Sequence, residues 1–221
     1  DYATFPLRIG ADSLGTLTGN TFNETAAGNV IEVLGEAVTD NQTWGPLALP
    51  YRVVSGSILV RKDTTTANVL TLLPGFTMQF ASVTGLEIAD TFNRGALMAV
   101  GTPAQPIVFT TSNPAPAAGQ WDGIDINGAA LDTSQMKYCV VEYAGRVNDA
   151  VVRVSSASPT LEHNTFRFGL DEGLELVSSG SAVRFNQFTN NQMYGVRVSS
   201  PAPTWRSTTT TSAGTRWARC P

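Results

Sequence analysis

A short strand-like segment recurs at a nearly fixed distance in the second half of the chain, and this repeat restricts the fold more than any other feature. Each copy ends in the order apolar, variable, apolar, which is the alternation of a β-strand with one face buried. The copies are GIDI at 123–126, VVRV at 151–154, GLEL at 173–176 and GVRV at 195–198, and the last two steps are equal in length. A regular step of this size is typical of proteins that stack one structural unit on the next.

A second segment precedes each of the three later copies. It reads MKYC at 136–139, LEHN at 161–164 and VRFN at 183–186, so it advances in nearly the same steps as the first. Shortly beyond each copy stands an apolar side chain: Val141, Phe166 and Phe188. The first half carries a looser version, in which 85–88 resembles the first segment and 70–80 resembles 97–109.

Composition excludes most other repeat architectures. The 221 residues include 20 Gly and 12 Pro, and the longest stretch without either runs only from 57 to 73. Long helices and helical solenoids are therefore not expected. No apolar run approaches the roughly 20 residues of a membrane span. A net charge of −4 argues against a nucleic-acid binder.

Short strands, a period near 22 and no intervening helix predict an all-β chain folded as a right-handed parallel β-helix. Each turn would contain three short strands, and successive turns would lie about 4.8 Å apart. A propeller blade needs about 40 residues per repeat, and the consensus of leucine-rich repeats is absent. We expect an N-terminal cap or irregular coil at 1–45, the β-helix at 46–205 and a non-repetitive tail at 206–221.

The charges support this register. Outward positions of the first segment read Asp125, Arg153, Glu175 and Arg197, and those of the second read Lys137, Glu162 and Arg184. Opposite charges on adjacent turns help by a few tenths of a kcal/mol, whereas like charges cost as much. The alternation of sign therefore predicts two ladders of ion pairs and a structural role for these residues.

Three further columns follow from the alignment. We expect Tyr138, His163 and Phe185 to stack as rings that face inward, and Val141, Phe166 and Phe188 to form an apolar column. Asn164 and Asn186 coincide at the corner that follows the second segment, and Cys139 occupies that corner one turn earlier. Asparagine at such a corner can hydrogen-bond the turn backbone.

Residues 50–205 resemble the secreted bacterial proteins of the right-handed parallel β-helix, pectin-lyase-like group. The residues that carry the resemblance are LLPGF at 72–76, GTPAQPIVF at 101–109, WDGI at 121–124 and MKYCVVEYA at 136–144. The resemblance implies secretion or a cell-surface location. The group includes polysaccharide lyases, glycosidases, esterases and surface proteins, but its polygalacturonase, pectate-lyase and pectin-methylesterase signatures are absent here, so no catalytic residue is transferred.

Two kinds of catalytic site are compatible with the sequence. His163 is the single histidine, and a serine nucleophile near it by register would be Ser156 or Ser178. The same position predicts a packed core histidine instead. A second possibility is a carboxylate group at one edge of a sheet, built from Asp122, Asp149, Asp171 and Glu172, which could serve glycoside hydrolysis or bind Ca²⁺. Acidic residues are equally common in turns.

Sugar binding requires only exposed aromatic rings beside polar groups, and Trp44, Trp121 and Tyr194 are the candidates. Trp121 could equally close an apolar turn. The leading hypothesis is an extracellular or cell-surface module that binds polysaccharide or serves a structural role, without a cofactor or a nucleic-acid partner. The alternative is a polysaccharide lyase, glycosidase or esterase with an unfamiliar site.

Overall fold

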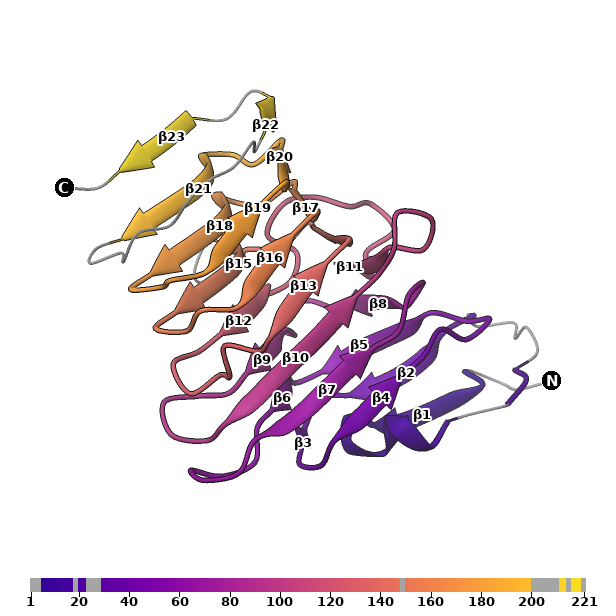
Figure 1. Cartoon of the computed structure of the whole chain (residues 1–221). Coiled ribbons are helices and arrows are strands. Elements are labelled where there is room, and N and C mark those ends of the chain that lie inside the picture. The colour runs from indigo at the N-terminus through magenta and orange to yellow at the C-terminus, as the bar shows by residue number, and fades with distance from the viewer. Residues whose placement is uncertain are drawn as a thin grey trace.

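Three parallel β-sheets form the walls of a β-solenoid with about 7 turns in this computed structural model. Its turns stack along one axis from the N-terminal strands, indigo in Figure 1, to the C-terminal strands, yellow. The structure describes residues 5–17, 20–22, 29–147, 150–199, 211–213 and 216–219. The predicted parallel β-helix is thereby confirmed.

From β2 (Ile31–Leu34) to β19 (Ala182–Arg184), each turn gives one strand to each sheet in the order A, B, C. Sheet A comprises β1 (Leu7–Gly10), β2 (Ile31–Leu34), β5 (Tyr51–Ser55), β8 (Thr77–Phe80), β11 (Ile107–Thr111), β14 (Cys139–Glu142), β17 (Thr165–Arg167), β20 (Gln187–Thr189) and β22 (Thr211–Ala213). Sheet B comprises β3 (Ala37–Val38), β6 (Ile58–Val60), β9 (Leu86–Ile88), β12 (Ile124–Ile126), β15 (Ala150–Ser155), β18 (Glu172–Val177), β21 (Tyr194–Ser199) and β23 (Arg216–Arg219). Sheet C comprises β4 (Gln42–Trp44), β7 (Asn68–Leu72), β10 (Gly95–Val100), β13 (Gln135–Lys137), β16 (Thr160–Glu162) and β19 (Ala182–Arg184).

The predicted register is confirmed where the two charge ladders test it. Arg153 pairs with Asp125 on one side and with Glu175 on the other, and Glu175 pairs with Arg197. The Glu175 carboxylate lies 3.1 Å from Arg153 and 2.8 Å from Arg197. The ladder of sheet C likewise places Glu162 3.1 Å from Lys137 and 3.4 Å from Arg184. These charged residues therefore hold successive turns together.

The turns are longer on average than predicted, about 25 residues rather than 22. The predicted spacing holds between Phe166 and its partner Phe188, but the step from Met78 to its partner Phe109 is clearly longer. Extra residues in the earlier turns lie in the connections, such as 112–123 between β11 and β12. Connections tolerate insertions because they do not enter the core.

The interior is a continuous apolar column, as the alternation predicted. Val141, Phe166 and Phe188 are all fully buried on adjacent strands of sheet A. The larger rings fill the middle turns, where Phe80 stacks on Trp121 with ring centroids 4.2 Å apart. Complete burial of a large apolar side chain contributes about 1.5–3 kcal/mol. This column therefore supplies most of the stabilisation of the fold.

The ring stack of Tyr138, His163 and Phe185 forms as predicted, but it faces outward rather than inward. The His163 centroid lies 4.8 Å from Tyr138 and 4.9 Å from Phe185, and Phe185 is 47% exposed. All three residues have positive φ, 51°, 57° and 56°. Strand alternation does not continue through a left-handed corner, so Glu162 and His163 both lie outside and Asn164 lies inside. The inward assignment of His163 was therefore wrong.

Each buried asparagine at this corner bonds through its side chain to the backbone of the preceding turn. The Asn164 side chain accepts a hydrogen bond from the N–H of Cys139 (2.9 Å) and donates one to the carbonyl of Met136 (2.8 Å). The Asn164 N–H in turn donates to the Asn186 side chain at 2.8 Å. Main-chain bonds such as His163 N–H to Arg184 (3.2 Å) also join the turns here, and the asparagine amides satisfy further backbone groups that burial would leave unpaired.

The stacked strands extend past both boundaries of the predicted β-helix at 46–205. Strands β1 to β4 lie before residue 46, and β22 and β23 lie after residue 205. The 3₁₀ helix η1 (Ala11–Thr16) contacts β1, β3 and β4, the first strand of each sheet. Its Ala11 and Leu14 are buried. Helix η1 therefore covers the N-terminal end of the core and protects open strand edges.

Val83 is strained, and its replacement by asparagine is expected to stabilise the protein by about 1 kcal/mol. It has φ 65° and is 61% exposed in the connection between β8 and β9. Asparagine tolerates this left-handed conformation, whereas a β-branched residue does not. Urea unfolding measures the change. The control is Val100→Asn on strand β10, where β-branching is favourable, so this substitution brings no gain. Equal stability of Val83→Asn and the wild type would contradict the strain.

Candidate functional site

The candidate nucleophile and base lie on different corners of the solenoid. His163 follows β16, at the corner that leads from sheet C to sheet A, and its ring lies between two aromatic rings. Ser178 follows β18, at the corner that leads from sheet B to sheet C, and Ser156 occupies the same corner one turn earlier. Both serines are exposed and have positive φ. The width of sheet C therefore separates each of these hydroxyls from the imidazole.

Two of the candidate carboxylates are used in ion pairs. Asp122 lies 2.5 Å from Arg146. Glu172 is 2% exposed and lies 3.1 Å from Arg197. Asp171 is half-buried just before β18, and Asp149 falls outside the described residues. Within the described ranges, no group of three or more His, Cys, Asp or Glu side chains is placed to hold a metal ion.

The two tryptophans proposed as sugar-binding surfaces are core residues. Trp44 is 2% exposed and Trp121 is fully buried. The Trp121 indole donates to the carbonyl of Glu142 at 2.8 Å, and the Trp44 indole donates to Gln42 at 2.7 Å. Their faces are covered, so neither can stack on a sugar. Tyr194 is half-buried at the start of β21.

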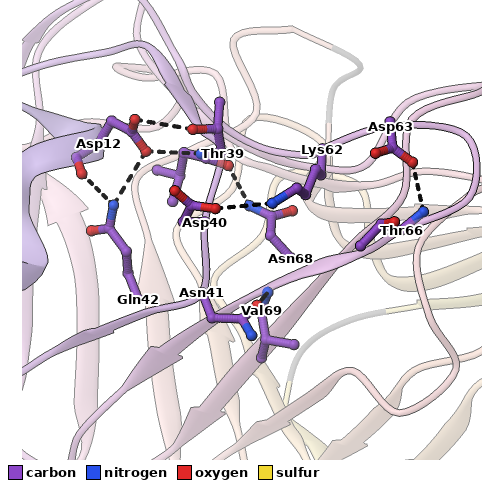
Figure 2. A network of polar contacts seen from close by, with 11 residues as sticks. Asp12, Thr39, Asp40, Asn41, Gln42, Lys62, Asp63, Thr66, Asn68 and Val69 are labelled. Carbon is purple, nitrogen blue, oxygen red and sulfur yellow. Dashed lines mark hydrogen bonds and ion pairs between the residues drawn. The ribbon is translucent and has the colours of Figure 1, made fainter.

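A hollow of about 660 Å³ lies at the N-terminal end. Its polar side chains bond to one another or to the backbone, as Figure 2 shows. Gln42 donates to Asp12, which accepts hydrogen bonds from Thr39, and Asn41 accepts one from the N–H of Val69. These bonds tie η1 to β3 and β4. The polar groups of this hollow therefore serve the end cap.

A smaller hollow of about 250 Å³ lies where three connections between sheets B and C stack. Its lining comes from the connections β6–β7, β9–β10 and β12–β13: Thr64, Phe92, Arg94, Gly128, Ala129 and Ala130. Main-chain hydrogen bonds join the connections, from Arg94 N–H to Asp63 (2.9 Å) and from Ala129 N–H to Asp90 (3.1 Å). The walls of this hollow are thus fixed by the solenoid.

Phe92 is the large apolar side chain that lines this hollow, and 70% of its surface is exposed. The carboxylate of Asp90 holds its turn by accepting from the N–H groups of Phe92 and Asn93, each at 2.7 Å. Arg61 also lies 3.0 Å from Asp90. Hydrogen bonds from Asn93, followed by that from Phe92 and the charge of Arg61, lower the pKa of Asp90 to about 2. The ring therefore protrudes from a rigid turn at neutral pH.

Arg94, beside this ring, differs from every other arginine whose side chain is described. All eight others make an ion pair or a side-chain hydrogen bond: Arg8, Arg52, Arg61, Arg146, Arg153, Arg167, Arg184 and Arg197. Arg94 makes neither to a described residue and is exposed. The nearby carboxylates of Asp63 and Asp90 accept hydrogen bonds from their own turns.

Phe92 and Arg94 were not among the residues selected from the sequence. They stand in DTFNR at 90–94, which has no copy among the repeats used for alignment. The available signal was a large aromatic residue between Asp and Asn in a turn, a context that normally holds polar residues. That signal locates an exposed ring, but only the stacking of connections brings it beside Thr64 and Gly128.

Like charges meet at one point of the sheet B ladder, where Glu87 pairs with Asp125. Burial, followed by the charges of Asp122 and Asp90, raises the pKa of Glu87, against the opposite effect of Arg61. Because the pKa of Glu87 is raised in the folded state, its contribution to the stability of the fold is fully present below pH 4.5, the ordinary pKa of glutamate. That contribution is lost as the pH rises through the pKa that Glu87 has in the folded protein.

Glu87→Gln is therefore expected to be more stable than the wild type at pH 7, with the difference shrinking toward zero below pH 4.5. Glutamine reproduces the neutral carboxyl at all pH values. Urea unfolding at a series of pH values measures the difference. Glu162→Gln is the control and is expected to have the opposite sign, since Glu162 lies between Lys137 and Arg184. A destabilised Glu87→Gln at pH 7 would contradict this account.

No protein-family model, curated protein or solved structure matches the chain. No helix in the described part of the chain has the length and apolar character needed to cross a bilayer. The class that the coordinates define is a parallel β-solenoid with a preformed hollow beside an exposed ring. What it binds has to be inferred from those side chains.

Proposed function

We propose that this chain is a carbohydrate-binding β-solenoid module, secreted or displayed at a cell surface. Its hollow at Phe92 would receive one sugar unit of a polysaccharide. The observation that carries the proposal is the exposed Phe92 ring, held on a rigid turn at the edge of a preformed hollow. Such a ring offers a sugar an apolar surface, and the polar groups around it can fix the orientation of the sugar.

The size and rigidity of the hollow favour a single ring-shaped unit. Its volume of about 250 Å³ lies just below the roughly 300–1,000 Å³ of most small-molecule pockets. The Thr64 hydroxyl and the Arg94 guanidinium provide hydrogen-bonding groups at its rim. Because the walls are preformed, little conformational entropy is lost on binding.

A binding role is preferred to the enzymatic alternative because of where the candidate catalytic residues lie. Ser178 and His163 stand on different corners, and the carboxylates of Asp122 and Glu172 are paired with arginines. General acid–base or nucleophilic catalysis requires two such groups within hydrogen-bond reach of one reacting centre. The extracellular location rests on the pectin-lyase-like resemblance and on a composition in which Lys62 and Lys137 are the only two lysines among the 14 Lys+Arg of the sequence.

Phe92→Ala is expected to weaken polysaccharide binding at least about tenfold, because it removes an apolar contact worth roughly 1.5–3 kcal/mol. Affinity electrophoresis in gels containing arabinogalactan, xylan, pectin, alginate or sulfated galactan measures binding by the whole chain. Phe185→Ala, which removes another half-exposed ring from a different corner, is the control and retains binding. Unchanged retardation of Phe92→Ala, or no retardation of the wild type by any polymer, would overturn the proposal.

A further inference from the structure

We infer that the hollow at Phe92 selects a sugar unit that carries an anionic group, a carboxylate or a sulfate, and that Arg94 is the residue that recognises it. This inference rests on the proposed function and adds the charge class of the ligand. Its basis is that Arg94 is exposed and lines the hollow, while its guanidinium makes no ion pair with a described residue.

The other arginines show what this protein does with a guanidinium that has a structural role. In each arginine ion pair among the described residues, the carboxylate is less exposed than the arginine. The side chain of Arg184 is 49% exposed and that of Glu162 is 18% exposed, while the values for Arg167 and Glu142 are 40% and 12%. Arg94 departs from this pattern. No carboxylate among the described residues lies within 4.0 Å of it, so its five donors are available to a ligand.

Neither of the neighbouring acids forms an ion pair with Arg94. The Asp63 carboxylate accepts from the N–H groups of Thr65 (2.7 Å) and Thr66 (2.6 Å), and these bonds lower its pKa. The Asp90 carboxylate is shared between its own turn and Arg61. Both carboxylates are therefore held by their own turns rather than by Arg94, which lines the hollow.

A planar cation beside an aromatic ring fits an anionic sugar better than an acidic peptide. The guanidinium can bind a carboxylate or sulfate through two parallel hydrogen bonds, while the Phe92 face covers the apolar side of the sugar ring. The hollow is formed by three stacked turns and has room for about one ring. An extended peptide would need a longer groove or a free strand edge.

The test compares three sugars that differ only at C6: galactose, galacturonic acid and galactose 6-sulfate. NMR titration of the ¹⁵N-labelled chain at pH 7 follows the amide signals of Phe92, Arg94 and Gly128. We expect both anionic sugars to bind about tenfold more tightly than galactose, as a charge-assisted bidentate contact predicts. Lowering the pH below about 3 protonates the carboxylate of galacturonic acid but not the sulfate. Binding of galacturonic acid alone is then weakened, which distinguishes a carboxylate from a sulfate as the group recognised.

Arg94→Gln is expected to bring the three affinities together, and Arg94→Lys to retain part of the preference. Arg184→Gln is the matched control, an exposed arginine in the sheet C ladder, and it keeps the wild-type preference. Equal affinities of the wild type for all three sugars would overturn the inference but leave the proposed function standing. Absence of any sugar binding would overturn both, as would binding of a polyglutamate peptide in place of the sugars.

Discussion

Asn164→Ala is expected to lower the free energy of unfolding by about 3–5 kcal/mol, because each buried backbone group left without a partner costs roughly 1–3 kcal/mol. The substitution removes the acceptor of the Cys139 N–H and the donor to the Met136 carbonyl. Asn164 is fully buried, so solvent does not reach these groups directly. Urea unfolding followed by circular dichroism measures the loss.

The control for Asn164 is Asn113→Ala, which changes an exposed asparagine whose side chain accepts one hydrogen bond, from the N–H of Ala115. Its expected cost is below about 1 kcal/mol. If Asn164→Ala proved as mild as this control, the asparagine column would not be what satisfies the corner backbone. The same experiment on Asn186, one turn later, should repeat the large effect, since Asn186 bonds to Asn164 N–H and to the Leu161 carbonyl.

Trp121→Ala is expected to destabilise the protein by about 3–5 kcal/mol, the usual cost of truncating a buried aromatic residue. The indole is fully buried, stacks on Phe80 at 4.2 Å and donates to the Glu142 carbonyl. Loss of the ring leaves a cavity and an unpaired carbonyl between two turns. Urea unfolding again provides the measurement.

Phe92→Ala is the matched control for Trp121, because it removes a large ring that is 70% exposed. Its stability should stay within about 0.5 kcal/mol of the wild type. The two substitutions therefore separate the aromatic residue that stabilises the core from the one that we propose to bind sugar. A Trp121→Ala protein as stable as the wild type would contradict the buried position of the indole.

The strands and their register could be predicted from the sequence because side chains alternate along a strand with a period of two. Opposite charges at paired positions on adjacent turns then identify the register. The alternation of Arg153, Glu175 and Arg197 was visible in the sequence and reappears as ion pairs. The corners were less predictable. His163 was placed inside because alternation was continued through a residue whose φ of 57° interrupts it. Backbone conformation at a corner depends on the neighbouring turns as well as on the residue itself.

The candidate site was harder to predict than the fold. Trp44 and Trp121 were chosen for their residue type, but burial removes them from the surface. Phe92 was passed over because it lies in a connection without a repeat, and connections vary in length from turn to turn. Which of their side chains meet depends on how the turns stack, a property that no local pattern encodes.

By itself, the sequence determined the architecture, the order of the strands and the charge ladders, because these follow from short periodicities that each turn repeats. The tertiary structure alone decided which rings are covered and which of the described arginines makes no side-chain hydrogen bond or ion pair with a described residue. Burial and ion pairing depend on atoms from several turns at once. Phe92 and Arg94 become neighbours of Thr64 and Gly128 only when three connections, far apart along the chain, lie on one another.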